Sequence, residues 1–418
     1  MMTASQLKIK TYWIWTFIIG VLYLMPVNFI GTMRFGEILF MVVVLLFPFR
    51  VWNQFRKFSE NKVFFVLLLL SLVITVISST ANDSSSIGIL KGGANILFTL
   101  SSFLGVFYLF RGHRERLIGF FLGLLISDYL FGYFILTEGT YEIVSEQETR
   151  NSQFFDLFVV PKLIPLIIAL GLIWKNSHIR MILIGLIIGL TGLLLNARSF
   201  GLVLIVSCAV CLMAQMNIAF LKRYLVLLVP VLFYLVYTGY RDAAYRGQLG
   251  DQSKAEIKES ELLGRNALST LLLSIGRPDP LVAMLAIEEK PIWGHGSYNP
   301  KGIRYVQMAD ALNILSDSRI NQFMARDEVS IPSHSVLLQS IVEGGIMAGL
   351  VWIYVIIVVV KMIYKHVSQR FTISSYQFLI IYLSIISLWG ILLSPYGFAR
   401  FDLPVYWAII ISHGALLK

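Results

Sequence analysis

The sequence predicts an all-α, polytopic membrane protein with about twelve transmembrane helices and one large, partly helical extramembrane loop. Hydrophobic residues make up 57% of the 418-residue chain, and a soluble domain of that composition would lack the polar surface that contact with water requires. Apolar runs recur at the length that a helix needs to cross a bilayer, about 20 residues. One long polar stretch interrupts them, so the chain has no room for a separate soluble catalytic domain.

The apolar runs form two groups of spans. We expect transmembrane helices 1–9 in residues 1–239, a large loop or cap in residues 240–333, and transmembrane helices 10–12 in residues 334–418. The predicted spans lie at about residues 11–31, 35–49, 63–80, 89–110, 117–137, 156–174, 181–197, 199–217, 224–239, 334–360, 374–395 and 403–417. The first run is too long for a signal-peptide core, so it is interpreted as an uncleaved span.

The Lys and Arg residues of the connections indicate the orientation, because short cytoplasmic connections are enriched in both. One side of the membrane collects most of them: Lys8, Lys10, Arg50, Arg56, Lys57, Lys62, Arg111, Arg114, Arg116, Lys175, Arg180, Lys222, Arg223, Lys361, Lys365, Arg370 and Lys418. The short connections of the other side hold Arg34, Lys91, Arg150, Arg198 and Arg400. Both termini are therefore predicted to be cytoplasmic, with the large loop outside. The net charge of +10 fits this topology and contact with anionic lipid, and it does not indicate a nucleic-acid partner.

The large loop is predicted to be a folded cap, because its positive and negative charges nearly balance. Asp279 and Pro280 are a suitable N-cap and first-turn pair for a helix over residues 281–289. Lys290-Pro291 ends that helix, and residues 294–297 (Gly-His-Gly-Ser) are predicted to form a turn.

Four basic residues of the predicted outer side are candidates for chemistry: His334, at the start of a predicted span, with Arg198, Arg265 and Arg277. Guanidinium groups bind phosphate oxygens in pairs and keep their charge, and a histidine can exchange a proton near neutral pH. Together they suit a phosphate-bearing lipid. The alternatives are that Arg198 is an interfacial anchor, that Arg265 and Arg277 form surface ion pairs, and that His334 is an interfacial or capping residue.

The sequence has no residue set typical of a metal or cofactor site: no Asp-x-Asp pair, no His-Glu-x-x-His motif and no Cys/His cluster. Arginines would therefore have to replace a metal at a diphosphate. Ser199 and Ser335 lack partners at a spacing that supports serine catalysis. Cys208 and Cys211 lie in an apolar run and are expected to be packing residues. Three charged residues within or near spans are expected to form structural ion pairs: Glu37, Asp128 and Lys162.

The region around His334 resembles the bacterial O-antigen ligase and polymerase family. Residues 291–296 (Pro-Ile-Trp-Gly-His-Gly) match its P-x-x-G-x-G turn. Residues 332–335 (Pro-Ser-His-Ser), followed by Gln339, Glu343-Gly344 and Gly349, match the family's histidine motif, which leads into a span.

Two arginine segments add to the resemblance, which covers about residues 180–360. Residues 196–199 (Asn-Ala-Arg-Ser) are similar to the family's Ser-Arg segment, with Ala197 where serine is common, and Gly276-Arg277 is similar to its Gly-Arg segment. These segments occur in the order of the family pattern and on one side of the predicted topology. The first five spans match the family only in being spans.

The resemblance implies a metal-independent membrane glycosyltransferase of the GT-C type on the periplasmic face of the bacterial inner membrane. Its donor would be a glycan on undecaprenyl diphosphate, with the lipid diphosphate as the leaving group. Arg198 and Arg277, with Arg265 as a third candidate, would bind that diphosphate, where charge develops in the transition state. His334 would act near the reacting centre, either as general base or as phosphate ligand.

Three functions remain possible: two that occur in the family, polymerase and ligase, and one from another class of protein, transporter or flippase. A polymerase, which joins lipid-linked repeat units, is favoured by the Pro-Ser-His-Ser form and by the extended segment over residues 298–330. An O-antigen ligase would instead pass the glycan to the lipid A core. A transporter or flippase would require paired charges and broken helices at the middle of the membrane. The partners implied are the lipid-linked donor, a glycan acceptor and membrane lipid, with room for a chain-length regulator.

Overall fold

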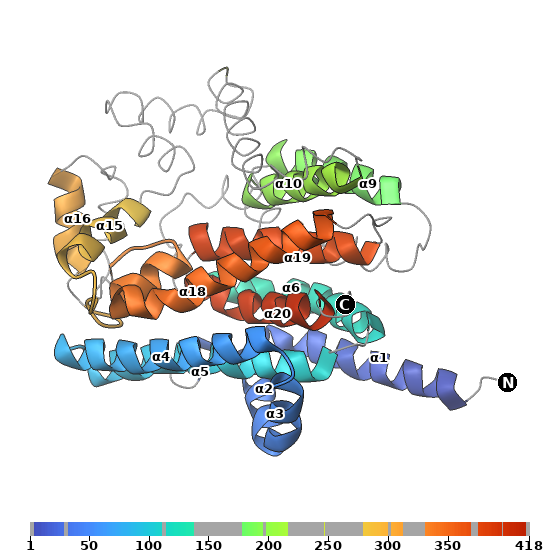
Figure 1. Ribbon diagram of the computed structural model, residues 1–418, viewed down its shortest axis with the longest axis horizontal. Coiled ribbons are helices and arrows are strands. Elements are labelled where there is room, and N and C mark those ends of the chain that lie inside the picture. The colour runs from blue at the N-terminus through green and yellow to red at the C-terminus, as the bar shows by residue number, and fades with distance from the viewer. Residues whose placement is uncertain are drawn as a thin grey trace.

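The computed structural model describes residues 4–28, 32–110, 114–137, 178–194, 198–215, 246, 279–299, 302–311, 331–368, 375–394 and 396–414. Within these residues the chain is 87% helical and forms thirteen helices (Figure 1). The predicted spans at residues 156–174 and 224–239 lie outside the described residues.

The helices are α1 (Ala4–Tyr23), α2 (Phe35–Leu46), α3 (Pro48–Phe55), α4 (Ser59–Ala81), α5 (Ser86–Phe110), α6 (Arg114–Thr137), α9 (His178–Leu194), α10 (Arg198–Gln215), α15 (Asp279–Glu289), α16 (Gly302–Ala311), α18 (Val336–Ser368), α19 (Ser375–Leu393) and α20 (Tyr396–Gly414). Two short strands, β1 (Pro26–Asn28) and β2 (Thr32–Arg34), form an antiparallel hairpin in which Val27 pairs with Met33. This hairpin, which joins α1 to α2, was not predicted from the sequence.

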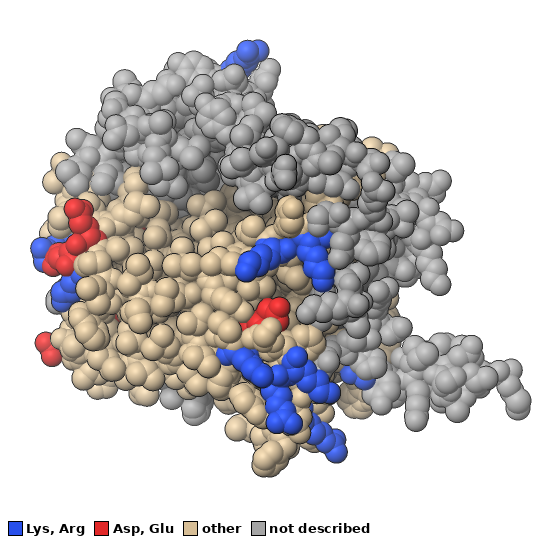
Figure 2. Space-filling view, viewed as in Figure 1, with Lys and Arg blue, Asp and Glu red and all other residues tan. Residues whose placement is uncertain are grey.

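Three described helices, α4, α5 and α18, are long and apolar enough to cross a membrane, and the bent pair α2 and α3 could be a fourth span. α4 buries Ser71, Thr75 and Ser78, whereas Val66 and Val73 are 62% and 53% exposed. Polar side chains inside and aliphatic side chains outside suit a helix surrounded by lipid. Figure 2 shows a broad band without charged side chains between the end near α15 and α16 and a basic group around α3. A helical protein compatible with a membrane is thus confirmed; twelve spans stay a prediction.

Small residues allow the helices to approach each other closely. A Cβ on Gly123 of α6 would lie 2.2 Å from the backbone oxygen of Phe17 in α1. Gly185 of α9 makes room for the sulfur of Cys208, which a Cβ there would approach to 2.7 Å. Cys208 and Cys211 are both buried and unbridged, which confirms that they are packing residues.

The predicted span over residues 35–49 is divided in the structure. α2 ends before Phe47, and α3 begins at Pro48 and lies at 95° to α2. Proline disfavours the helical conformation in the residue before it, and Phe47 has φ −125° and ψ 44°. α3 buries Val51 and Phe55 and leaves Phe49 83% exposed, as expected of an amphipathic helix at a membrane surface.

α18 is broken at Gly344 and Gly345, whereas the sequence predicts one continuous span over residues 334–360. Gly345 has φ 71° and ψ −176°, a conformation that is unfavourable for any residue with a Cβ. Glycines occur in uninterrupted transmembrane helices as well, so the sequence alone does not distinguish a break from a close contact.

The two parts of α18 form a helical hairpin, with residues 336–343 as a short arm and residues 346–368 as a long arm. Trp352 Nε1 donates a hydrogen bond of 2.8 Å to Ser340 Oγ. In a straight helix these two residues would be about 18 Å apart along the axis, so the arms must run side by side in opposite directions. The long arm, of about 34 Å, is long enough to cross a bilayer by itself.

The predicted helix of the cap is confirmed as α15, which packs against α16 at one end of the bundle (Figure 1). The two helices share a small apolar core. It contains Val282, Ala283, Ala286, Tyr305, Val306 and Ala309, with Ile331 and Val342 from the segments around the short arm. This core fixes the cap to the start of α18.

Candidate functional site

His334 and Asp279 form a hydrogen-bonded pair at the junction of the cap and α18. His334 Nδ1 lies 2.7 Å from Asp279 Oδ2. Asp279 is the first residue of α15, and His334 lies two residues before the first residue of the short arm, Val336. The side chain of Asp279 is 6% exposed and that of His334 is 28% exposed. The carboxylate is therefore shielded, while the imidazole remains partly exposed.

The backbone holds His334 in an uncommon conformation. Its φ is 45°, in the left-handed region that a residue with a Cβ rarely adopts and that costs about 1–3 kcal/mol. Next to it, Ser335 Oγ accepts a hydrogen bond from Leu338 N at 3.2 Å and donates one to Ile391 O at 3.0 Å. Ser335 is thus the N-cap of the short arm and links it to α19. Its buried hydroxyl supports the prediction that Ser335 is not a nucleophile.

The P-x-x-G-x-G turn packs against the histidine motif. We call this contact the clasp, formed by residues 291–297 and residues 342–346. Three backbone hydrogen bonds join its two sides: His295 N to Val342 O at 2.7 Å, Gly296 N to Glu343 O at 2.9 Å and Ile346 N to Pro291 O at 2.9 Å. The break in α18 leaves backbone groups without their helical hydrogen bonds, and the clasp supplies hydrogen-bond partners for them.

The side chain of Glu343 lies within the clasp and is bound on both oxygens. Ser297 Oγ donates to Oε2 at 2.9 Å, and Gln339 Nε2 donates to Oε1 at 3.0 Å. Ser78 of α4 donates to the backbone oxygen of Glu343 at 2.8 Å. Glu343 thus joins the cap, α18 and α4, which is a structural role for a residue of the histidine motif.

The turn over residues 294–297 also rests on the end of α4 and the beginning of α5. Ser79 Oγ accepts a hydrogen bond of 2.8 Å from Ser297 N. A Cβ on Gly92 would lie 2.3 Å from Ser297 Oγ, and one on Gly88 would lie 3.2 Å from Ser297 O. These two glycines, one helical turn apart, form the groove into which the turn fits.

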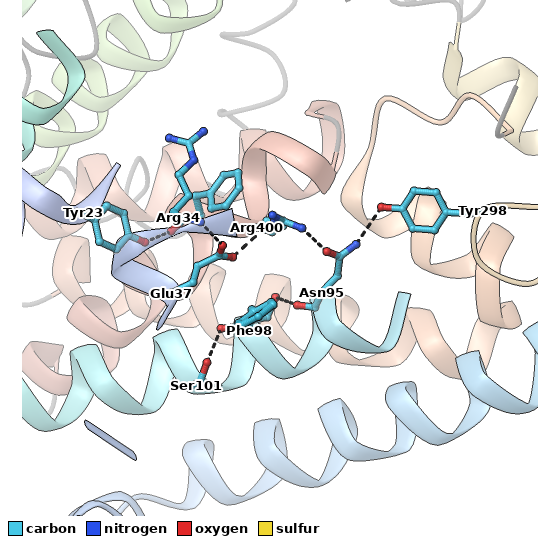
Figure 3. A network of polar contacts seen from close by, with 10 residues as sticks. Tyr23, Arg34, Glu37, Asn95, Phe98, Ser101, Tyr298 and Arg400 are labelled. Atoms are coloured by element: carbon cyan, nitrogen blue, oxygen red, sulfur yellow. Dashed lines mark hydrogen bonds and ion pairs between the residues drawn. The ribbon is translucent and has the colours of Figure 1, made fainter. Parts of the chain in front are cut away.

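A second polar network joins α2, α20, α5 and the turn (Figure 3). Arg400 Nε lies 3.6 Å from Glu37 Oε1, and Arg400 Nη1 donates to Asn95 Oδ1. Asn95 Nδ2 in turn donates to the Tyr298 hydroxyl at 3.3 Å. The ion pair confirms the structural role predicted for Glu37, whose side chain is 1% exposed.

Arg34 is the second arginine of this network. Its Cζ lies 4.0 Å from the ring centroid of Phe401, and Arg400 Cζ lies 4.4 Å from the same centroid. In Figure 3 the Arg34 guanidinium points away from Glu37. Both guanidinium groups therefore make cation–π contacts with the Phe401 ring.

Charged groups on the outer surface of the cap stabilise α15 and α16 against each other. The Tyr305 hydroxyl donates to Glu289 Oε2 at 2.7 Å, and Arg304 Nη2 lies 3.2 Å from the same oxygen. The hydrogen bond from Tyr305, with a smaller contribution from Arg304, holds the pKa of Glu289 below its usual value. Glu289 therefore stays ionised in moderately acidic solution.

Of the predicted site residues, His334 is the one whose side chain the structure describes. Arg198 is the first residue of α10, but its side chain lies outside the described part, as do Arg265 and Arg277 entirely. Whether the three arginines converge on His334 stays a prediction. The side chain of Asp128, expected in an ion pair, and all of Lys162 also lie outside the described part.

Two features of the site were not predicted from the sequence. Asp279 was predicted to be a helix cap, and nothing in the sequence indicates its partner, because it lies 55 residues from His334. Arg34 and Arg400 share with Arg198 a signal that was available, since all three break the positive-inside bias on the predicted outer side. That signal points to arginines with a specific partner.

Comparison of the chain with protein-family models, with curated proteins and with solved structures gave no match. The resemblance to the O-antigen ligase and polymerase family therefore stays a prediction that depends on the motifs alone.

Proposed function

We propose that this protein is a metal-independent membrane glycosyltransferase that polymerises undecaprenyl-diphosphate-linked oligosaccharide repeat units, as for O-antigen or a related surface polysaccharide. The observation that carries the proposal is the contact of 2.7 Å between His334 and Asp279. It gives the histidine of the family-like motif a fixed orientation and a carboxylate partner, which is the arrangement that a general base requires.

The pair supports the role of base over that of phosphate ligand. Asp279 Oδ2 accepts a hydrogen bond from the Nδ1–H group of His334, which leaves the lone pair of the neutral ring on Nε2. Nε2 then takes the proton from a hydroxyl of the acceptor sugar, and the oxygen bonds to the anomeric carbon of the donor. The bond from that carbon to the diphosphate oxygen breaks, and the electron pair leaves with undecaprenyl diphosphate. The Asp279 carboxylate stabilises the imidazolium formed at His334.

The leaving diphosphate gains negative charge during this step. We assign its stabilisation to Arg198 and Arg277, with Arg265 as a third candidate. Guanidinium groups that bind the charge more strongly in the transition state than in the substrate lower the barrier.

The basic residues around α3 support an orientation with the reaction on the periplasmic face of the bacterial inner membrane. Arg50, Arg56, Lys57 and Lys62 are exposed beside the beginning of α4. The clasp contacts the other end of α4, about 35 Å away for a helix of its 23 residues. By the positive-inside rule, the basic end faces the cytoplasm, as do both termini, and the cap and His334 belong to the periplasmic side.

The proposal can be tested with purified protein in nanodiscs and undecaprenyl-diphosphate-linked repeat units as sole substrate. A polymerase produces a ladder of glycan lengths. Product that forms only after lipid A core is added would identify a ligase, and movement of the lipid-linked unit across the bilayer without transfer would identify a flippase. Loss of activity on chelation of divalent cations would contradict the metal-free mechanism.

Variants of the pair test the assignment of the base. His334→Ala should lower the rate of transfer by about 10²–10⁴-fold, the usual contribution of a general base. Asp279→Asn should lower kcat and change its pH profile, with little effect on KM. Asp310→Asn removes an exposed carboxylate of the same cap and is the matched control. Full activity in the first two variants would refute the assignment.

A further inference from the structure

Residues 291–298, which include the first side of the clasp and are called the turn below, carry two large exposed apolar side chains. They are Ile292 and Trp293, which are 59% and 58% exposed. They lie against the beginning of the long arm, since Ile346 N donates to Pro291 O at 2.9 Å. Ile346 and the next residue, Met347, are 50% and 40% exposed and belong to a candidate span. The apolar surface that lipid covers on the span therefore continues onto the turn.

The polar neighbours of this surface have the composition of a membrane interface. Lys290 precedes the turn, and its Nζ donates to Asn82 Oδ1 at the end of α4. Lys91 Nζ of α5 lies 5.5 Å from the ring centroid of Tyr298, which is 38% exposed. Tryptophan and tyrosine collect where hydrocarbon meets headgroups, and lysines there extend their amines toward water and phosphate.

The charged surface of the cap lies beyond the turn. Asp83, Glu288 and Asp310 are exposed at this end of the bundle, which Figure 2 shows as the charged end next to the uncharged band. Exposed carboxylates belong in water, so the boundary of the hydrocarbon must pass between them and the exposed aliphatic side chains of α4 and α18. The turn of residues 291–298 lies at that boundary.

We propose that residues 291–298 lie in the headgroup layer of the membrane, with Ile292 and Trp293 inserted among the lipid chains. Lipid, and no protein partner, covers this surface. The cap is then held at the membrane surface by a contact with lipid as well as by the clasp. The inference depends on exposure, charge and continuity with the span, and it is independent of the proposed catalytic activity.

Cysteine variants labelled with a polarity-sensitive fluorophore test the proposal in nanodiscs that contain lipids with a nitroxide near the headgroup. Trp293→Cys is the test position. Asp310→Cys is the control for an aqueous position, and Val66→Cys, at a 62% exposed residue of α4, is the control for lipid. The unsubstituted protein, whose two cysteines are buried, is the labelling blank.

We expect quenching at position 293 to exceed that at position 310 several-fold, with a blue-shifted emission. Quenching no greater than at position 310 would overturn the proposal, because the turn would then be in water. Protection of position 293 from the labelling reagent without quenching by lipid would also overturn it, since a protein would then cover the surface. Wild-type elution of all variants in gel filtration shows that the labelled chains are folded.

Discussion

Replacement of Gly345 by alanine should open the clasp. The residue has φ 71° and ψ −176°, a region populated almost only by glycine, and an L residue held there costs about 1–3 kcal/mol. A Cβ at this position would also lie 1.8 Å from the backbone oxygen of Ile292. Because backbone atoms must move to relieve that overlap, we add about 1–3 kcal/mol for overpacking. The expected loss of stability is about 2–6 kcal/mol in total.

The loss can be measured as the midpoint of thermal unfolding in detergent. An unfolding entropy of about 2.1 cal/mol/K per residue for the 418-residue chain converts it to a decrease in Tm of about 2–7 °C. Gly93→Ala is the matched control, since a Cβ there would meet Leu72 Cδ1 at 3.6 Å, an ordinary contact. In the interior of α5, that substitution should be neutral or stabilise the protein by up to about 1 kcal/mol.

Gly345→Ala should also reduce the rate of glycan transfer, because the short arm that follows His334 is anchored at Gly344 and Gly345. Equal Tm values for the wild-type protein and Gly345→Ala would refute the explanation of the break in α18. A lower Tm in Gly93→Ala than in Gly345→Ala would refute it as well, because the effect would then follow from any added methyl group.

Two further predictions concern ion pairs. Glu289→Gln removes a carboxylate whose pKa the Tyr305 hydroxyl lowers from 4.5. The stability from this contact is present above the unfolded pKa and is lost as pH falls through the lower folded pKa. The difference in Tm between the wild-type protein and Glu289→Gln should therefore be constant near neutral pH and disappear in acid. Tm measured across pH tests this prediction, and a difference that persists at the acid end would contradict it. Arg400→Ala leaves the buried Glu37 carboxylate without its ion-pair partner and should cost about 3–5 kcal/mol. Glu37→Gln in the same chain should recover part of that loss in Tm, and an additive double variant would argue against the pair.

The parts of the structure that could be predicted depend on local residue patterns. α15 follows from Asp279 and Pro280 at its start and from Lys290-Pro291 at its end, since capping and proline geometry act within one turn. The buried pair Cys208 and Cys211 follows from the apolar run around it. The expected ion pair of Glu37 follows from the cost of a lone carboxylate among apolar helices, although its partner could not be named.

The contacts of the candidate site could not be predicted, because they join residues that are far apart in the chain. Asp279 and His334 are 55 residues apart, and Arg400 and Asn95 are 305 residues apart. The hairpin of α18 also depends on contacts with residues that are distant in the chain. A pair of glycines in an apolar run is compatible with a straight helix, and the hydrogen bonds that favour the break come from residues 291–297 and from Ser78 of α4.

By itself, the sequence determined that this protein is helical and apolar enough for a membrane, because those properties depend on composition and on periodicity within single segments. The tertiary structure decided which charged side chains meet and where a helix breaks. Those outcomes depend on the free energy of satisfying buried polar groups, and the groups that satisfy Asp279, Glu343 and Arg400 come from other parts of the chain.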